Sequence, residues 1–121
     1  MFVVDGEKFT IDMHRGDTGV LAITADTEYA FSQVDRAIFT VKDNQGTIVK
    51  EVVAQMTDNR FVVVFNNEDT DSLTPGIYEW DVRFVVSPVY SVDGRIIDGE
   101  GGVYTPKDPM TLNLRRTIGQ I

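Results

Sequence analysis

The stretch from Asp69 to Phe84 constrains the fold of this chain more than any other, because it reads as a turn followed by a half-buried strand. Thr74-Pro75-Gly76 has the chemistry of a turn, since proline presets φ at the second position and glycine tolerates positive φ at the third. After this turn, apolar and charged side chains alternate. The apolar positions are Tyr78, Trp80, Val82 and Phe84. We therefore expect a strand with one buried aromatic face.

Further strand-like runs recur at short intervals between Gly, Pro, Asn and Asp, and no sustained 3.6-residue apolar period appears. The runs at 36–42 and 47–56 flank a short polar loop that ends in Gly46, so they predict a β-hairpin. Residues 67–73 read as a single helical turn with an asparagine cap. The other expected strands are residues 8–14, 19–25, 60–66, the run that follows Gly76 and continues through Val92, 103–104 and 110–114.

The region after Phe84 leaves two hairpin tips open, because Asp93-Gly94 and Asp98-Gly99 both suit a tight turn. Choosing between them changes the strand register. Pro88 lacks a backbone donor and therefore favours an edge strand or a bulge. Residues 110–114 read as a last edge strand.

Seven or eight short strands in 121 residues predict an all-β domain, with an immunoglobulin-like β-sandwich as the first choice and a small β-barrel as the alternative. The cysteine pair of antibody domains is missing. We expect one domain over residues 1–121, with 1–7 and 115–121 as loose termini. A hydrophobic content of 42% is enough for a real core.

Composition argues against several classes of partner. A net charge of −8 opposes binding to a phosphate backbone, so nucleic acid is not an expected partner. No cysteine is present for a disulfide or a thiolate zinc site. The first residues lack the pattern of a secretion signal, and no apolar run approaches the roughly 20 residues of a membrane helix. We therefore expect no membrane insertion.

Residues for catalysis are scarce, and we expect no enzyme activity, no cofactor and no metal. His14 is the single histidine and reads as a partly exposed strand residue. No serine stands in a Gly-x-Ser-x-Gly setting. Paired carboxylates such as those of Asp98 and Glu100 do not form a calcium-loop pattern and read as loop charge. Arg15-Gly16-Asp17 reads as an ordinary turn and not as an adhesion motif.

Two groups of residues are candidates for binding. The strand at 60–66 is apolar on both faces, so its second face requires cover either by the chain itself or by a neighbouring subunit. Val62 and Val64, together with Ile38, are therefore candidate interface residues, and a homo-oligomer is one expected outcome. Tyr90 and Tyr104 lie beside glycine-rich loops and are candidate aromatics for stacking on a sugar ring, which makes a carbohydrate-binding module the alternative function.

Several short motifs give the chain a family resemblance. In order, they are Phe9-Thr10-Ile11, Arg15-Gly16-Asp17-Thr18, Ile38-Phe39-Thr40-Val41-Lys42, Glu68-Asp69-Thr70 with Leu73, Pro75-Gly76-Ile77-Tyr78-Glu79-Trp80-Asp81-Val82 and Asp93-Gly94-Arg95. With them the chain resembles the immunoglobulin-like domains of phage and prophage virion proteins. It is most similar to the N-terminal domain of tail baseplate upper proteins and to related small phage structural proteins.

This resemblance implies a non-enzymatic assembly module that associates with copies of itself or with other virion proteins. It also implies synthesis in the cytoplasm of a bacterial host and a final location in the virion, in a baseplate, tail or head accessory position. Two features depart from the family pattern. The stretch 87–104 is longer and richer in glycine, and no receptor-binding or fibre region follows Ile121, so we expect a free-standing small virion protein.

Overall fold

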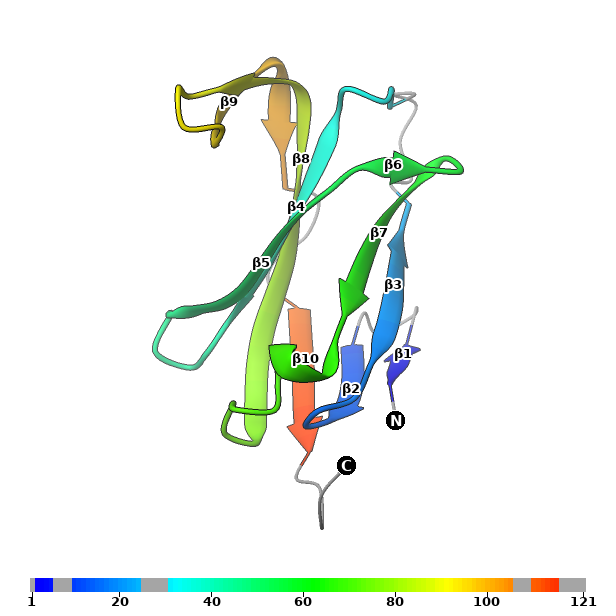
Figure 1. The fold of residues 1–121 in the computed structure, drawn as a ribbon, viewed down its shortest axis with the longest axis vertical. Helices are drawn as coiled ribbons and strands as arrows, with labels where there is room; N and C mark the ends of the chain where they lie inside the picture. Colours follow the sequence, from blue (N-terminus) through cyan, green and yellow to red (C-terminus); the bar gives the residue numbers. More distant parts are fainter. Residues whose placement is uncertain (1, 6–9, 25–30, 106–109, 116–121) are drawn as a thin grey trace.

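The computed structural model describes residues 2–5, 10–24, 31–105 and 110–115, and it is a β-sandwich of two sheets (Figure 1). Sheet A has the order β1-β2-β10-β8-β4-β5, with β9 also paired to β8, and sheet B has the order β3-β7-β6. The two sheets are not closed into a barrel. The elements are β1 (Val3–Asp5), β2 (Thr10–His14), β3 (Gly19–Ile23), β4 (Arg36–Lys42), β5 (Ile48–Ala54), β6 (Met56–Thr57), β7 (Arg60–Phe65), the 3-10 helix η1 (Asn67–Asp69), β8 (Gly76–Tyr90), β9 (Ile96–Tyr104) and β10 (Met110–Arg115).

Strand β8 organises sheet A, because its 15 residues give three other strands an edge to pair with. One edge pairs with β4 over residues 79–85. The opposite edge pairs first with β10, over residues 76–80, and then with β9, over residues 84–90. The strand predicted after Gly76 is therefore confirmed, and it extends to Tyr90.

The alternation seen in the sequence of β8 is the basis of the core. Tyr78, Trp80, Val82 and Phe84 are all buried, as predicted. Phe39 of β4 packs against Trp80 and, across the sandwich, against Phe65 of β7, with ring centroids 5.5 and 5.8 Å apart. Aromatic rings at these distances in tilted and edge-to-face geometry attract one another beyond simple area burial. These contacts join the two sheets.

The strand order is that of a variable-type immunoglobulin domain. There, a sheet containing strands G, F, C and C′ faces a sheet containing B, E and D. Here β10-β8-β4-β5 faces β3-β7-β6 in the same order. Tyr78, near the start of β8, donates its hydroxyl proton to the carbonyl oxygen of Thr74 at 2.6 Å. This contact has the form of the tyrosine corner of immunoglobulin folds.

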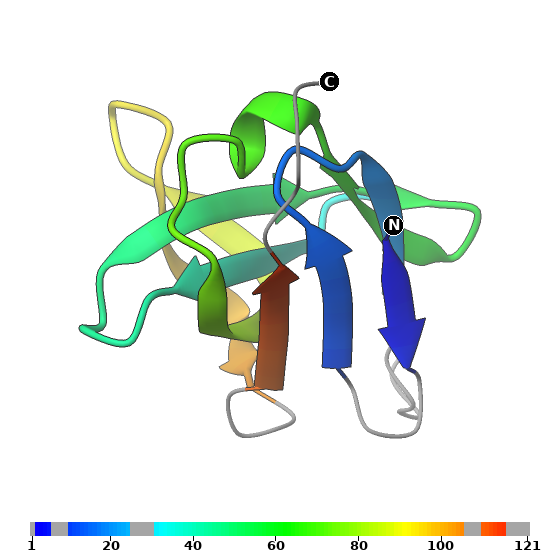
Figure 2. The ribbon, with the colours of Figure 1, turned by 90° about the horizontal axis from the view of Figure 1, so that it is seen from below.

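Three elements differ from the sequence prediction. Val3–Asp5 was expected to be a loose terminus, but it pairs antiparallel with β2. β10 was expected at an edge, but it lies between β2 and β8, as Figure 2 shows for β1, β2 and β10 side by side. The run 47–56 was expected to be one strand, but it divides into β5 and β6, which belong to different sheets. The position of β10 depends on its pairing with the distant strand β2, which local patterns do not encode. The pairings of β1 with β2 and of β6 with β7 join neighbouring segments.

The hairpins follow from residues that tolerate positive φ. The hairpin of β4 and β5 is confirmed. Between β8 and β9 the tip is Asp93-Gly94, where Gly94 has φ of 85° and the N–H of Ser91 donates to the carbonyl of Arg95 at 2.8 Å. Asp58 and Asn59 connect β6 to β7 with φ of 51° and 63°. Positive φ at both central positions is typical of the type I′ turn, whose twist suits a hairpin.

One side of the sandwich is closed by the chain itself. The chain passes there from β5 in sheet A to β6 in sheet B. Lys50 of β5 forms an ion pair of 2.9 Å with Asp69 of η1, and its ammonium lies 4.9 Å from the ring centre of Phe65. Asp69 also accepts the backbone N–H of Asn66 at 2.7 Å, within a capping box. These contacts hold η1 against β5.

The opposite side, on the right of Figure 1, is where both sheets end, sheet A with β1 and sheet B with β3. Phe2 packs between them, with its ring centre 5.2 Å from that of Phe65. A Cβ atom at Gly19 would overlap the Phe2 ring, so glycine is required for this close approach. Among the described residues, no helix is long and apolar enough to cross a membrane.

The ion pair of Asp69 predicts a loss of stability in acid. Burial alone would raise the pKa of Asp69, but the hydrogen bond from Asn66 and the Lys50 ammonium outweigh it and hold the pKa below its ordinary value. The ionised form therefore stabilises the fold above the ordinary pKa of about 3.9, and this contribution disappears as the pH falls through the lower folded value. We expect Asp69→Asn to lower the free energy of unfolding by about 1 kcal/mol at pH 7.

Urea unfolding at a series of pH values measures this effect. The difference between Asp69→Asn and the natural chain should shrink steadily below about pH 4. Asp71→Asn, at an exposed position two residues away, is the control and should change the free energy of unfolding little at any pH. A difference for Asp69→Asn that is the same at pH 7 and pH 2.5 would contradict the assignment.

Candidate functional site

The outer face of sheet B carries an apolar patch, which we call the valine face and define as Val20, Ala22, Val62 and Val64. Val20 of β3 lies opposite Val64 of β7, and Ala22 lies opposite Val62. The alternation of the strands explains this, since Leu21, Phe61, Val63 and Phe65 occupy the positions between and fill the core. Val20 is 60% exposed and Val64 is 48% exposed. Four neighbouring apolar side chains thus face outward.

The two outward valines of the strand 60–66 differ in how far the chain itself covers them. Val62 is half-buried, whereas Val64 remains exposed. The chain's own described segments therefore do not cover Val64. Cover by a neighbouring molecule stays the open alternative for this position.

Ile38 lies on the other side of the molecule. It is half-buried on the outer face of sheet A, opposite Val53 of β5 and Arg83 of β8. Val62 and Val64 belong to the outer face of sheet B. The three residues singled out from the sequence as one candidate interface therefore form two separate surfaces.

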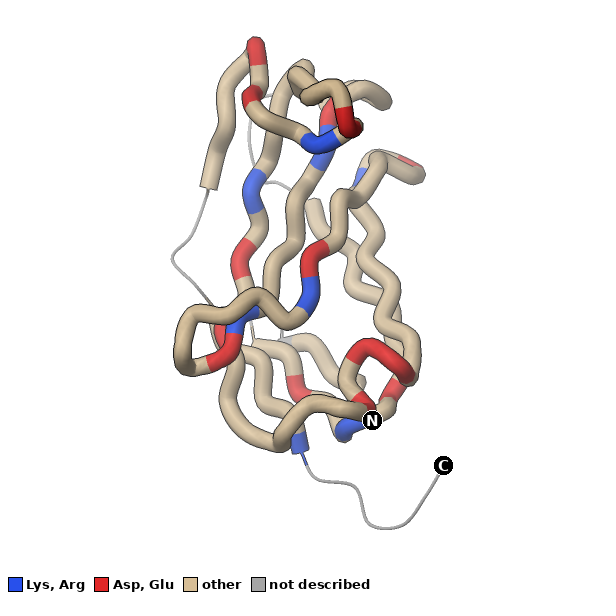
Figure 3. Tube along the Cα trace, turned by 60° about the vertical axis from the view of Figure 1, so that its left-hand side comes forward, with Lys and Arg blue, Asp and Glu red and all other residues tan. Residues whose placement is uncertain are grey.

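The outer face of sheet A is charged, in contrast to the valine face. Its β8 positions are Glu79, Asp81 and Arg83, and Lys42 of β4 lies directly opposite Glu79. Glu51 of β5 faces the same side. Charged residues follow the strands of sheet A, whereas β3 and β6 contain none and β7 contains only its first residue, Arg60 (Figure 3). The protein's charge is thus distributed unequally between its two faces.

A second candidate region surrounds a bulge in β8. Ser87 has φ of 49°, and the pairing of β8 with β9 shifts register between Val86 and Pro88. The prediction that Pro88 marks an edge or a bulge is therefore confirmed. A left-handed conformation is unusual for a residue other than glycine and persists only where its surroundings fix it.

Asp35 supplies that constraint. Its carboxylate is fully buried and accepts the backbone N–H of Ser87 at 2.9 Å and that of Ser32 at 2.8 Å. One carboxylate thus links the segment before β4 to the bulge of β8, which lies 52 residues further along. Sequence reasoning missed Asp35. The spacing of Ser32 and Asp35 signals a local turn, but nothing local signals Ser87.

An open cavity of about 540 Å³ lies beside this bulge. Tyr90 is one of its walls, and Arg36 and Glu100 bring opposite charges to it. Arg36 already donates to the carbonyl oxygens of Gln33 and Asp35, at 2.7 and 2.9 Å. The lining consists of Gln33, Val34, Arg36, Ser87, Pro88, Val89, Tyr90 and Glu100.

Tyr104, the second candidate aromatic, does not line this cavity. In the pairing of β8 with β9, Tyr90 lies opposite Ile96 at one end, and Tyr104 lies opposite Phe84 at the other. The hydroxyl of Tyr104 donates to the carbonyl of Gly101 at 3.0 Å. Both rings are exposed, but they do not form one stacking platform. A carbohydrate site made of this pair stays a prediction without support from their arrangement.

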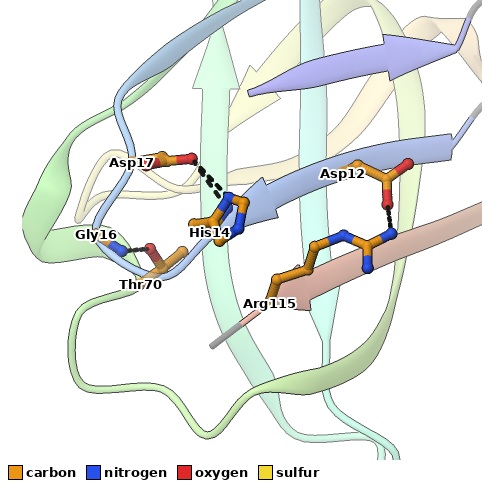
Figure 4. Close-up of polar contacts among 6 residues, drawn as sticks. All are labelled: Asp12, His14, Gly16, Asp17, Thr70 and Arg115. Atoms are coloured by element: carbon orange, nitrogen blue, oxygen red, sulfur yellow. Dashed lines mark hydrogen bonds and ion pairs between the residues drawn. The ribbon is translucent and has the colours of Figure 1, made fainter. Parts of the chain in front are cut away.

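The Arg15-Gly16-Asp17 segment is a turn fixed by hydrogen bonds (Figure 4). The N–H of Gly16 donates to the hydroxyl of the buried Thr70 at 2.9 Å. Asp17 accepts the backbone N–H of His14 at 2.9 Å, and its carboxylate lies 3.9 Å from Nδ1 of the same residue. Burial would raise the pKa of Asp17, but hydrogen bonds such as that from His14 hold it below its ordinary value. A structural role accounts for this turn.

Arg115 closes the same end of sheet A, where it forms an ion pair of 3.0 Å with Asp12 (Figure 4).

Within the described part of the chain, no group of three or more histidine or acidic side chains is placed to hold a metal ion. Comparison with protein-family models, with curated proteins and with solved structures finds no match to this chain.

The buried position of Asp35 predicts a large loss of stability on its removal. In Asp35→Ala, the N–H groups of Ser32 and Ser87 lose their acceptor. A buried donor without a partner costs about 1–3 kcal/mol, so we expect the free energy of unfolding to fall by about 2–4 kcal/mol. Urea denaturation followed by Trp80 fluorescence measures the change.

Asp43→Ala is the matched control. Asp43 also accepts two backbone N–H groups, those of Gln45 and Thr47, each at 2.9 Å. These donors lie in an exposed turn where water replaces the carboxylate, so the loss should stay below about 1 kcal/mol. Equal effects of the two substitutions would show that burial of Asp35 is not the cause.

Proposed function

We propose that this chain is a non-enzymatic structural module of a phage or prophage particle. It is made in the cytoplasm of the bacterial host and acts in the virion by association with other virion proteins or with copies of itself. Two independent lines support the proposal. One is the resemblance of the sequence motifs to phage immunoglobulin-like domains, and the other is the valine face.

Residues of two of the motifs have structural roles in this fold, which is consistent with a family of shared architecture. Asp69 pairs with Lys50, and Leu73 packs against the core. Trp80 is buried and donates from Nε1 to the carbonyl oxygen of Thr111 at 3.1 Å. These residues would keep a domain folded in any particle.

The valine face is the observation that carries the proposal. An exposed patch of neighbouring apolar side chains is commonly an interaction site, because its burial against a partner releases ordered water. Val20 and Val64 lie side by side as one row of this patch and are both exposed. A binding face without charge suits permanent assembly more than a transient encounter, since obligate interfaces are the more hydrophobic ones.

Val64→Lys tests whether this face docks in the particle. The lysine places a charge on the valine face, and burial of that charge against an apolar partner is unfavourable. We expect incorporation of the variant into particles to fall at least about tenfold, which corresponds to about 1.4 kcal/mol. The measurement is the amount of tagged chain in particles purified by density gradient from the bacterium that carries the gene.

Val53→Lys is the control, because Val53 is also 48% exposed on a strand but lies on the outer face of sheet A. Circular dichroism and soluble yield establish that both variants fold. Absence of the natural chain from purified particles would contradict the particle assignment. Equal incorporation of the two variants would contradict the assignment of the valine face.

A further inference from the structure

Strand β3 is the one described edge strand without a feature that prevents pairing with another chain. Natural sheets protect their edges with charges, proline, bulges or very short strands. Edge strand β5 carries Lys50 and Glu51, and β9 carries Asp98 and Glu100. β1 and β6 are only three and two residues long. β3 has five residues, Gly19–Ile23, with no charge and no proline, and its pairing with β7 shows no bulge.

The absence of charge makes that edge the place where a second copy of this chain can pair with least repulsion. Each chain carries a net charge of −8, so two copies repel one another wherever charged strands meet. At β3 and the adjoining positions of the valine face, no charge is present to oppose the contact. Because the edge is also apolar on both of its faces, a second β3 is a complementary strand for it.

We propose that β3 pairs antiparallel with β3 of a second copy, about a two-fold axis that passes beside Leu21. This inference rests on the proposed function as an assembly module and names its first partner. Pairing about Leu21 uses all five residues of β3. It places Val20 opposite Ala22 of the second copy and Gly19 opposite Ile23.

The parity of the register supports this geometry. Directly opposed residues of paired strands point to the same face of a sheet. Leu21 points to the core, whereas Val20 and Ala22 point outward. Pairing Leu21 with Leu21 of the second copy therefore keeps the cores of both copies on the same side of the joined sheet. A shift by one residue would instead place Leu21 opposite a residue that points outward.

The pairing has a consequence for the valine face. Two three-stranded sheets become one continuous sheet across the axis. The row Val64-Val20 is then continued by Ala22 and Val62 of the second copy. The dimer thus uses the edge of β3 and leaves the two valine faces joined in one larger surface, free to dock on another virion protein.

Cysteine crosslinking tests the register directly, because the natural chain has no cysteine. Val20→Cys and Ala22→Cys are prepared separately, with a tag on one so that the disulfide products differ in size, and are mixed under mild oxidation. Directly opposed Cβ atoms lie about 4.5–5.5 Å apart, and diagonal ones about 7–8 Å. We expect the mixed disulfide to form at least about tenfold faster than either homodimeric disulfide. Equal or slower formation of the mixed product would overturn the register.

Charge substitutions test the dimer itself, and light scattering and sedimentation measure the mass of the particles in solution. The natural chain should have twice the monomer mass of 13.5 kDa. In the double variant Val20→Lys/Ala22→Lys, each lysine lies opposite a lysine of the second copy. This repulsion should raise the dissociation constant about tenfold or more. Val20→Glu/Ala22→Glu should do the same. A mixture of the two should recover dimers, because each lysine then faces a glutamate, and this recovery excludes misfolding as the cause.

Val64→Lys separates this inference from the proposed function. It lies on β7, away from the paired edge, and should leave the dimer intact while it lowers incorporation into particles. A natural chain that is monomeric at millimolar concentration would overturn the dimer. Failure of the mixture to recover dimers would overturn it as well. Particle incorporation would still decide the proposed function in either case.

Discussion

The packing of Phe39 between Trp80 and Phe65 is the contact on which the rest of the structure depends, because it joins the two sheets through their central strands. Strand β8 brings Trp80 to this point and also provides the edges for β4, β9 and β10. The charged residues that alternate with its aromatic face necessarily point outward. The same alternation that builds the core therefore makes the outer face of sheet A charged.

Sheet B follows the same rule with a different result, because the outward positions that β3 and β7 share are apolar and the charged Arg60 stands only at the start of β7. Between the core positions of β3 and β7 lie Val20, Ala22, Val62 and Val64, and no charge separates them. Lys50 and Asp69 fix one side of the sandwich, whereas the other side ends in the uncharged strand β3. Stability alone does not require an apolar outer face. The role that we propose for the chain gives this asymmetry a purpose.

How much of the structure could be predicted depends on how local its cause is. The buried face from Tyr78 to Phe84 and the hairpin of β4 and β5 follow from alternation and turn residues, and both are confirmed. The interior position of β10 depends on parallel pairing with β2, about 100 residues away, and has no local signature. Asp35 was missed for the same reason. Val62, Val64 and Ile38 were correctly recognised as outward apolar residues, but their separation onto two faces became evident only from the sheet order.

The assembly that we propose for this protein begins at the uncharged edge strand β3, where a second copy pairs. Amide hydrogen exchange of the natural chain, compared between dilute and concentrated solution, tests it without any substitution. We expect exchange of the amides within 20–23 that point away from β7 to slow at high concentration, whereas exchange in the charged edge strand β5 does not change. Equal exchange of these amides at both concentrations, or slowing confined to β5, would contradict pairing at β3.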